Sequence, residues 1–230
     1  MSDIVSAPLS FRASPDHSEV SAHLILPHDA AALYVFGHGA GAGMRHPFME
    51  AAADGLARRR VATLRYQFPY MELGRKAPNR TPVLIQTVGA AVAEARRLAP
   101  GLPLLAGGKS MGGRMTSIAA AEAPLEGMRG LAFFGFPLHA AGRPSAARGA
   151  HLSGVGLPML FLQGSRDPLA DLSLLRPLLR ALRPPPSLHV VDGADHGFHV
   201  LKRSGRTDAE VLDELCDRMA GWVREVVAEA

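Results

Sequence analysis

Short apolar runs alternate with longer amphipathic stretches along most of this 230-residue chain. The apolar runs are rich in branched and aromatic side chains, as β-strands are, and most end in glycine or a turn. From the third onward they are nearly continuous in apolar residues, which is typical of strands covered on both faces. The eight predicted strands are 4–12, 19–26, 33–39, 61–66, 103–108, 131–136, 158–164 and 188–193.

The stretches between these runs have the periodicity of helices. In 47–59, for example, Phe48, Ala52 and Leu56 fall on one helical face. The other predicted helices are 82–98, 111–121, 172–182 and 208–227. Strands that alternate with helices in this way predict βαβ units, and therefore a doubly wound, mostly parallel α/β sheet with helices on both faces. The length favours a single domain, 1–230.

Two predicted loops, 67–80 and 137–157, leave the carboxyl ends of strands. Ligands bind at this edge of an open α/β sheet. The second loop is long enough for a short helix but not for a lid domain. We therefore expect a minimal cap and a comparatively open site.

Composition excludes several classes of protein. The chain is 47% hydrophobic with a net charge of +4, which indicates a soluble globular protein. Its only tight basic run, 58–60, ends a predicted helix and has no aromatic partners, so nucleic-acid binding is not expected. One cysteine, Cys216, allows no disulfide within the chain, which fits a reducing compartment.

The sequence suggests a cytoplasmic protein without a membrane anchor. Its N-terminus lacks the basic and apolar regions of a signal peptide, and no apolar run approaches the ~20 residues that span a bilayer. Metal-ligand spacings such as H-x-x-x-H are also missing, so we expect neither a metal nor a cofactor. Whether the chain is a monomer or a homodimer stays open.

The stretch PLLAGGKSMGGRM, 103–115, allows two interpretations. A phosphate-binding loop, G-x-x-x-x-G-K-[ST], would need glycine at position 103, where Pro103 stands. Proline offers no N–H and fixes φ, so it cannot make that turn. A nucleotide-dependent enzyme is therefore disfavoured.

The second interpretation is a nucleophile elbow, in which a serine lies between a strand and a helix. Gly108 and Gly112 flank Ser110 at the spacing G-x-S-x-G, and the predicted strand and helix adjoin it on either side. Asp167 follows the strand 158–164, and His196 follows the last strand. A serine needs a neutral imidazole to accept its proton, and the imidazole needs a carboxylate to orient it.

These residues are the predicted catalytic group, with alternatives at two positions. His199 and His189 are the other histidines near His196, and Asp171 is a second acid, although it is better placed to cap the following helix. Asp192 and Asp195 are too close to His196 in sequence to meet its ring easily.

GHGAGAG, 37–43, follows the third predicted strand. A His-Gly turn at this point can direct a backbone N–H toward a developing oxyanion. We assign this N–H to Ala40 and a second one to Met111, directly after the serine.

The ordered motifs resemble the α/β-hydrolase superfamily, and within it the dienelactone-hydrolase-like group. A narrower likeness, to small intracellular testis-expressed hydrolases and to a hydrolase-like subunit of a chromatin acetyltransferase complex, is carried by HGAGAGMRHPFME, FPYM, FPLHAAGRP and QGSRDPL. The resemblance implies the hydrolase fold, although some members of the group are thought to act as scaffolds. Dienelactone hydrolases proper use a cysteine nucleophile where this chain has Ser110.

The leading functional hypothesis is a serine hydrolase that acts on a small ester, thioester or lactone. The alternative is a non-catalytic interaction module with the same fold. Residues that could contact an acyl substrate are His38, Gly39, Tyr70, His139 and Arg143, each with a structural role as its alternative. Lys109 is expected to point away from the site, as residues before an elbow serine usually do.

Overall fold

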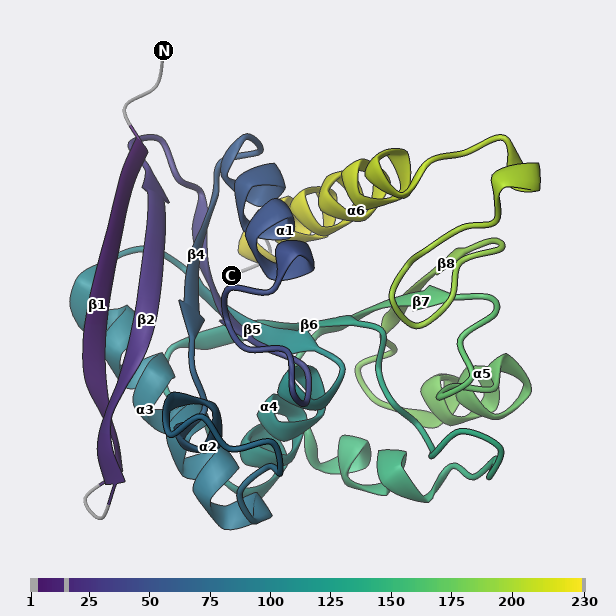
Figure 1. The fold of residues 1–230 in the computed structure, drawn as a ribbon, viewed down its shortest axis with the longest axis horizontal. Helices are drawn as coiled ribbons and strands as arrows, with labels where there is room; N and C mark the ends of the chain where they lie inside the picture. Colours follow the sequence, from purple (N-terminus) through teal and green to yellow (C-terminus); the bar gives the residue numbers. More distant parts are fainter. Residues whose placement is uncertain (1–3, 15–16, 229–230) are drawn as a thin grey trace.

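The computed structural model describes residues 4–14 and 17–228. An eight-stranded sheet runs through the molecule (Figure 1). Its strand order is β1-β2-β4-β3-β5-β6-β7-β8. The strands are β1 (Ile4–Ser14), β2 (His17–Pro27), β3 (Ala32–Gly37), β4 (Val61–Tyr66), β5 (Leu104–Lys109), β6 (Met128–Phe134), β7 (Met159–Gly164) and β8 (Ser187–Val191).

Strand pairing is antiparallel at one edge and parallel elsewhere. β1 and β2 form a long antiparallel hairpin, and β2 is also antiparallel to β4. All pairs from β4 to β8 are parallel. The predicted mostly parallel α/β sheet is therefore confirmed, and the carboxyl ends of β3 to β8 meet along one edge.

Five of the six α-helices correspond to predicted ones, with ends that differ by one or two residues. The helices are α1 (Pro47–Ala57), α2 (Pro69–Glu72), α3 (Thr81–Leu98), α4 (Met111–Glu122), α5 (Leu172–Ala181) and α6 (Asp208–Ala228). Two 3₁₀ helices, η1 (Ala147–Gly154) and η2 (Lys202–Ser204), complete the described part of the chain. The short helix allowed for in loop 137–157 is η1, whereas α2 and η2 were not predicted.

Side-chain hydrogen bonds fix the first residues of α5 and α6. Asp171 accepts a hydrogen bond from the Ser173 N–H at 2.8 Å and caps α5, as predicted. Thr207 and Glu210 form a capping box at α6: the Thr207 hydroxyl accepts from the Glu210 N–H, and the Glu210 carboxylate accepts from the Thr207 N–H. Polar capping residues thus fix where α5 and α6 begin.

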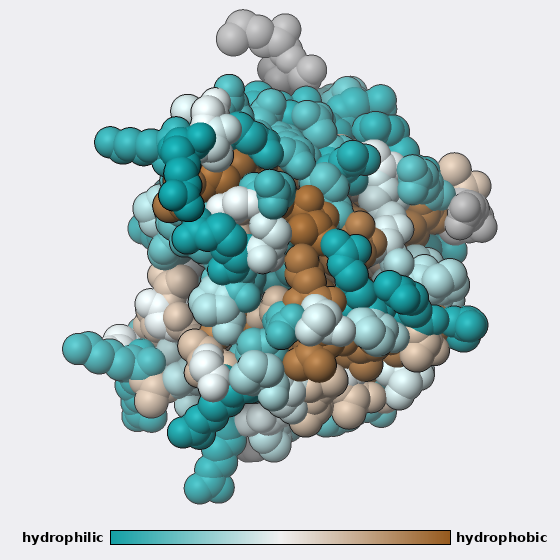
Figure 2. Space-filling model, turned by 90° about the vertical axis from the view of Figure 1, so that its right-hand side faces the viewer, coloured by the Kyte–Doolittle hydropathy of each residue, from teal (hydrophilic) through white to brown (hydrophobic). Residues whose placement is uncertain are grey.

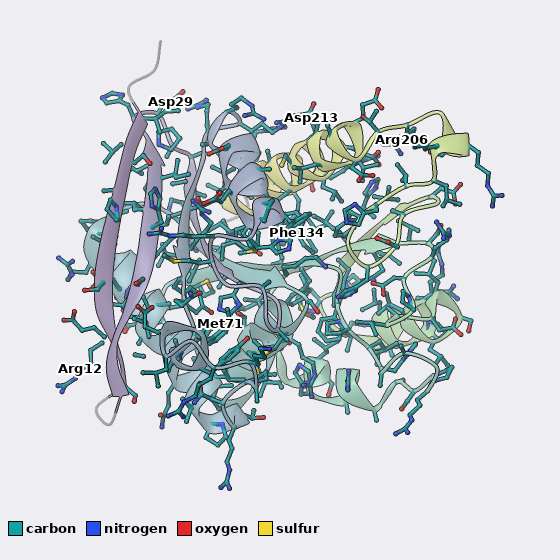
Figure 3. All side chains as sticks on the ribbon, viewed as in Figure 1. Arg12, Asp29, Met71, Phe134, Arg206 and Asp213 are labelled. Carbon is teal, nitrogen blue, oxygen red and sulfur yellow. The ribbon has the colours of Figure 1, made fainter. Side chains whose placement is uncertain are left out.

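The helices cover both faces of the sheet, α1 and α6 on one and α3, α4 and α5 on the other (Figure 1). Successive strand residues alternate between two apolar cores: in β6, Phe133 packs with the α3–α5 layer and Phe134 with the α1–α6 layer. Figure 3 labels Phe134 near the centre of the molecule, where its ring lies 5.8 Å from that of Phe48 on α1. This alternation explains why the strand sequences are apolar on both sides.

The face at the β8 edge of the sheet is largely hydrophilic, with a narrow hydrophobic band across its middle (Figure 2). β8 is the last strand of the sheet, and its residues are more exposed than those of β7. Among the residues described, none of the helices combines the length and apolar character that a bilayer crossing requires.

The centre of the sheet leaves no room for a side chain at Gly107. This residue has a φ of +151°, and a Cβ there would lie 1.8 Å from the Ala132 carbonyl oxygen of β6. We expect Gly107→Ala to lower the free energy of unfolding by at least about 3 kcal/mol, because strand β5 would have to move away from β6. Urea denaturation would measure the loss.

A matched control for this substitution is Gly89→Ala. Gly89 lies inside α3, where an added Cβ meets nothing within 4 Å. Alanine should stabilise that helix by about 0.5–1 kcal/mol. Equal effects of the two substitutions would contradict the packing argument.

Candidate active site

Ser110 lies on a strained turn between β5 and α4. Its φ and ψ are 52° and −116°, a conformation that non-glycine residues rarely adopt. The turn is tight because the backbones of β3, β5 and α4 are in contact: a Cβ added at either Gly108 or Gly112 would lie 2.3 Å from the Gly37 carbonyl oxygen. The predicted strand–turn–helix elbow is therefore present, with its two glycines required by close approach.

The three predicted catalytic side chains form a continuous hydrogen-bonded chain. The Ser110 Oγ lies 2.8 Å from the Nε2 of His196, and the His196 Nδ1 lies 2.7 Å from the Oδ2 of Asp167. Ser110 follows β5, Asp167 follows β7 and His196 follows β8, so the parallel sheet brings together residues up to 86 positions apart. In this arrangement Nδ1 carries the proton that Asp167 accepts, and Nε2 is free to accept the serine proton.

Asp167 is held in place by groups besides the imidazole. Its side chain is fully buried, and its Oδ1 accepts from the Leu169 N–H at 2.8 Å. Its Oδ2 also accepts from the Nε2 of Gln163, whose own Oε1 accepts from the Phe136 N–H at 2.9 Å. The contact of Gln163 with Asp167 was not predicted from the sequence. The one indication there was a polar side chain inside an otherwise apolar strand.

The two N–H groups predicted as oxyanion donors, of Met111 and Ala40, have no hydrogen-bond acceptor in the described part of the chain. Met111 is the first residue of α4, so its N–H has no partner within the helix. The loop that carries Ala40 lies against the elbow, since a Cβ added at Gly39 would be 3.6 Å from the Ser110 Cβ.

His38 supports this loop from beneath. It is fully buried, its Nδ1 lies 2.7 Å from the Gly39 carbonyl oxygen, and its Nε2 accepts from the Phe68 N–H at 3.2 Å. Burial lowers the pKa of His38 to about 4, so the ring is neutral near pH 7. Both nitrogens are engaged with backbone groups, which favours the structural alternative for His38.

The connection after β4 anchors the same loop at further points. The Tyr70 hydroxyl accepts from the Gly41 N–H at 3.0 Å, and the Gln67 Oε1 accepts from the Met44 N–H at 2.9 Å. Arg65, at the end of β4, donates to the Met44 carbonyl at 3.0 Å. Tyr70 was predicted as a substrate contact, but its hydroxyl is bound to the loop and its side chain is buried.

The other two predicted contacts lie in the connection between β6 and β7. His139 is buried, with its Nδ1 3.0 Å from the Ala140 carbonyl and its Nε2 accepting from the Asp171 N–H at 2.8 Å. Both ring nitrogens therefore fasten the backbone. Arg143 is exposed in a turn closed by its own N–H on the Ala140 carbonyl.

The rival acids and bases are engaged elsewhere. His199 is exposed, with its Nδ1 2.6 Å from Asp208, and this carboxylate raises its pKa. The His189 Nε2 lies 2.6 Å from Glu214. Asp195 accepts from the N–H groups of Gly197 and His199 and so shapes the loop around His196.

Lys109 does not point away from the site, contrary to the sequence-based expectation. Its Nζ donates to the His196 carbonyl at 2.5 Å. Nothing in the local sequence signals this contact, because the two residues are 87 positions apart. No cluster of three or more metal-binding side chains occurs among the described residues.

Comparison with known families agrees with the fold. The model of a family described as "Alpha/beta hydrolase domain" matches residues 30–224. This chain belongs to that family. The matched segment includes all the residues of the site described above and begins after the β1–β2 hairpin.

Solved α/β-hydrolase structures are similar over nearly the whole chain. A dienelactone hydrolase from Anabaena variabilis is 21% identical with a TM-score of 0.76, covering 96% of this chain and 98% of its own. An α/β serine hydrolase without a lid from Xanthomonas campestris is 20% identical with a TM-score of 0.70, covering 97% and 94%. A serine hydrolase homologue from Coxiella burnetii is 16% identical with a TM-score of 0.74, covering 92% and 96%. At these identities the likeness concerns the fold.

The Tyr70 hydroxyl gives a test of what this residue does in the α/β-hydrolase site. Tyr70→Phe removes the acceptor for the Gly41 N–H and should loosen the loop that carries the Ala40 N–H. We expect kcat on a p-nitrophenyl ester to fall about 5- to 50-fold with KM changed less than about twofold, because oxyanion donors act in the transition state. A rise in KM at constant kcat would instead support the predicted substrate contact.

Proposed function

We propose that this α/β hydrolase is a serine hydrolase that works through an acyl-enzyme. The observation that carries the proposal is the chain of two short hydrogen bonds from Ser110 through His196 to the buried Asp167. A hydroxyl next to a neutral imidazole that a buried carboxylate orients is the arrangement that activates a serine.

Acylation begins when the Ser110 Oγ attacks the carbonyl carbon of the substrate. Its proton passes to the His196 Nε2, and Asp167 stabilises the imidazolium that forms. The carbonyl oxygen becomes an oxyanion beside the N–H groups of Ala40 and Met111. Collapse of this intermediate expels the leaving group, which takes the proton from His196.

Deacylation repeats the sequence with water as the nucleophile. His196 accepts a proton from water, the hydroxide attacks the acyl carbon, and the acid product leaves as Ser110 regains its proton. The neutral His38 and the hydrogen bonds to Met44 hold the loop that carries Ala40, here called the oxyanion loop, before substrate arrives. Such preorganised donors cost little reorganisation during the reaction.

The proposed substrates are small esters, thioesters or lactones. The connection between β6 and β7, where a cap could be inserted, contains η1 as its only helix in the described residues. A site without a lid encloses little of a long acyl chain, which favours short ones. The similar Xanthomonas campestris structure is also described as a serine hydrolase without a lid.

A non-catalytic interaction module is the alternative from another class. A scaffold would have no need to bury the Asp167 carboxylate and align it with a half-buried imidazole, since burying an ionisable group costs stability. The nucleotide-binding interpretation is wrong, because 104–109 form strand β5 where the phosphate loop would have to lie.

A fluorophosphonate probe tests the proposal directly, because it bonds covalently to an activated serine. We expect the wild type to be labelled at Ser110 and to hydrolyse p-nitrophenyl acetate or butyrate. Ser110→Ala should abolish both, and Asp167→Asn should lower kcat by about 10³–10⁴-fold through the wrong histidine tautomer. Mass spectrometry of the labelled protein locates the probe.

Equal labelling of the wild type and Ser110→Ala would refute the assignment. Ester hydrolysis that persists in His196→Ala at the wild-type rate would do the same. A folded wild type that neither reacts with the probe nor turns over any short acyl ester would favour the interaction module.

A further inference from the structure

The ammonium group of Lys109 lies against the back of the His196 loop. Its Nζ donates to the His196 carbonyl at 2.5 Å, and it lies 5.7 Å and 5.4 Å from the ring centres of Phe48 and Phe198. These distances place the cation over two aromatic faces, which attract it. Among the described residues, no carboxylate forms an ion pair with Lys109.

Gly135 leaves the space that this arrangement needs. It has a φ of +70°, and a Cβ there would lie 3.1 Å from the Lys109 Nζ and 3.4 Å from both the Cε1 and Nδ1 of the His196 ring. The ammonium and the imidazole thus both border the space beside Gly135, directly after β6. Lys109 touches the backbone of His196 and lies close to its ring.

Lys109 is also the residue that precedes Ser110. It ends strand β5, and its backbone pairs with Phe134 of β6. A hydrogen bond from its side chain to His196 therefore ties the loop carrying the imidazole to the strand carrying the hydroxyl. On the basis of the proposed function, we propose that Lys109 is a positioning residue that holds His196 in line with Ser110.

Stability alone gives little reason for a lysine at this position. Burial lowers the pKa of Lys109 to about 8, despite the opposing attraction of Asp167 and Asp195, so the fold disfavours its charge. A methionine side chain of similar length would pack against the same rings without that cost. Removing the hydrogen bond should therefore impair alignment and not folding.

Lys109→Met is the decisive variant, with Lys202→Met as its matched control. Lys202 is exposed in η2, on the connection that follows the His196 loop, so its substitution removes the same charge without touching the site. We expect Lys109→Met to lower kcat about 10- to 100-fold with KM within about twofold, because small misalignments of reacting groups have effects of this size. Lys109→Gln, which keeps a donor but not the reach, should show the same loss.

The pH dependence of stability tests whether the pKa of the Lys109 ammonium is lowered in the folded chain. Between pH 8 and 10.5 the unfolded chain keeps the Lys109 proton and the folded chain loses it, so this group by itself makes stability rise with pH. The buried Cys216 thiol, whose pKa is raised to about 12, acts in the opposite direction in every variant that keeps it. His196, His199, Asp167 and Asp195 are the titratable groups around it, and all four are present in both variants. Compared with the wild type at each pH, Lys109→Met should therefore become relatively less stable as the pH rises through this window, whereas Lys202→Met should not.

A readout that does not depend on turnover separates this inference from the proposed function. The Nδ1 proton of His196 bonded to Asp167 should give a far-downfield proton NMR signal in the wild type. We expect Lys109→Met to shift or broaden it without any loss of thermal stability, and Lys202→Met to preserve it. An unchanged signal in Lys109→Met, or an unchanged kcat, overturns the positioning role, whereas failure of Ser110 labelling in the wild type overturns only the proposed reaction.

Discussion

The active-site geometry depends on a close approach of three backbones at the centre of the sheet. The Gly37 carbonyl of β3 lies where a side chain of Gly108 or Gly112 would have to be, so β5 can turn into α4 only with glycine at both positions. Ser110 stands between these two glycines and has a φ of 52°, a strained conformation for a residue with a side chain. The same contact brings the oxyanion loop against the elbow. Ser110 and the loop that carries Ala40 are therefore positioned by packing in the scaffold.

The imidazole, in contrast, depends on polar contacts. Asp167 orients the ring from the β7 side, with Gln163 and the Leu169 N–H holding the carboxylate. Lys109 contacts the backbone of the same histidine from β5. Loops tolerate displacement more readily than strands do, because fewer apolar contacts hold them. Polar anchors of this kind compensate for that weakness at the residue whose alignment matters most.

Most of the fold and the three central residues could be predicted because their signals are local. Strand character, helical periodicity and the G-x-S-x-G turn occupy a few consecutive residues each, and the order of strands then places Ser110, Asp167 and His196 at one edge. The roles of Gln163 and Lys109 were not predictable in this way. Gln163 is a single polar residue within an apolar strand, and Lys109 donates a hydrogen bond to a residue 87 positions away. Such contacts are set by tertiary packing alone.

Most of the polar residues predicted to contact substrate are bound to the backbone of neighbouring loops instead. His38, Tyr70 and His139 each use their polar atoms on the backbone of a neighbouring loop, so they shape the site without presenting free donors to it. Of that set, Arg143 is the one whose charged group has no hydrogen-bond or ion-pair partner within the described residues. In the serine hydrolase that we propose, recognition therefore depends chiefly on the reacting carbonyl and on shape. This supports the proposed preference for small acyl groups, selected by size more than by charge.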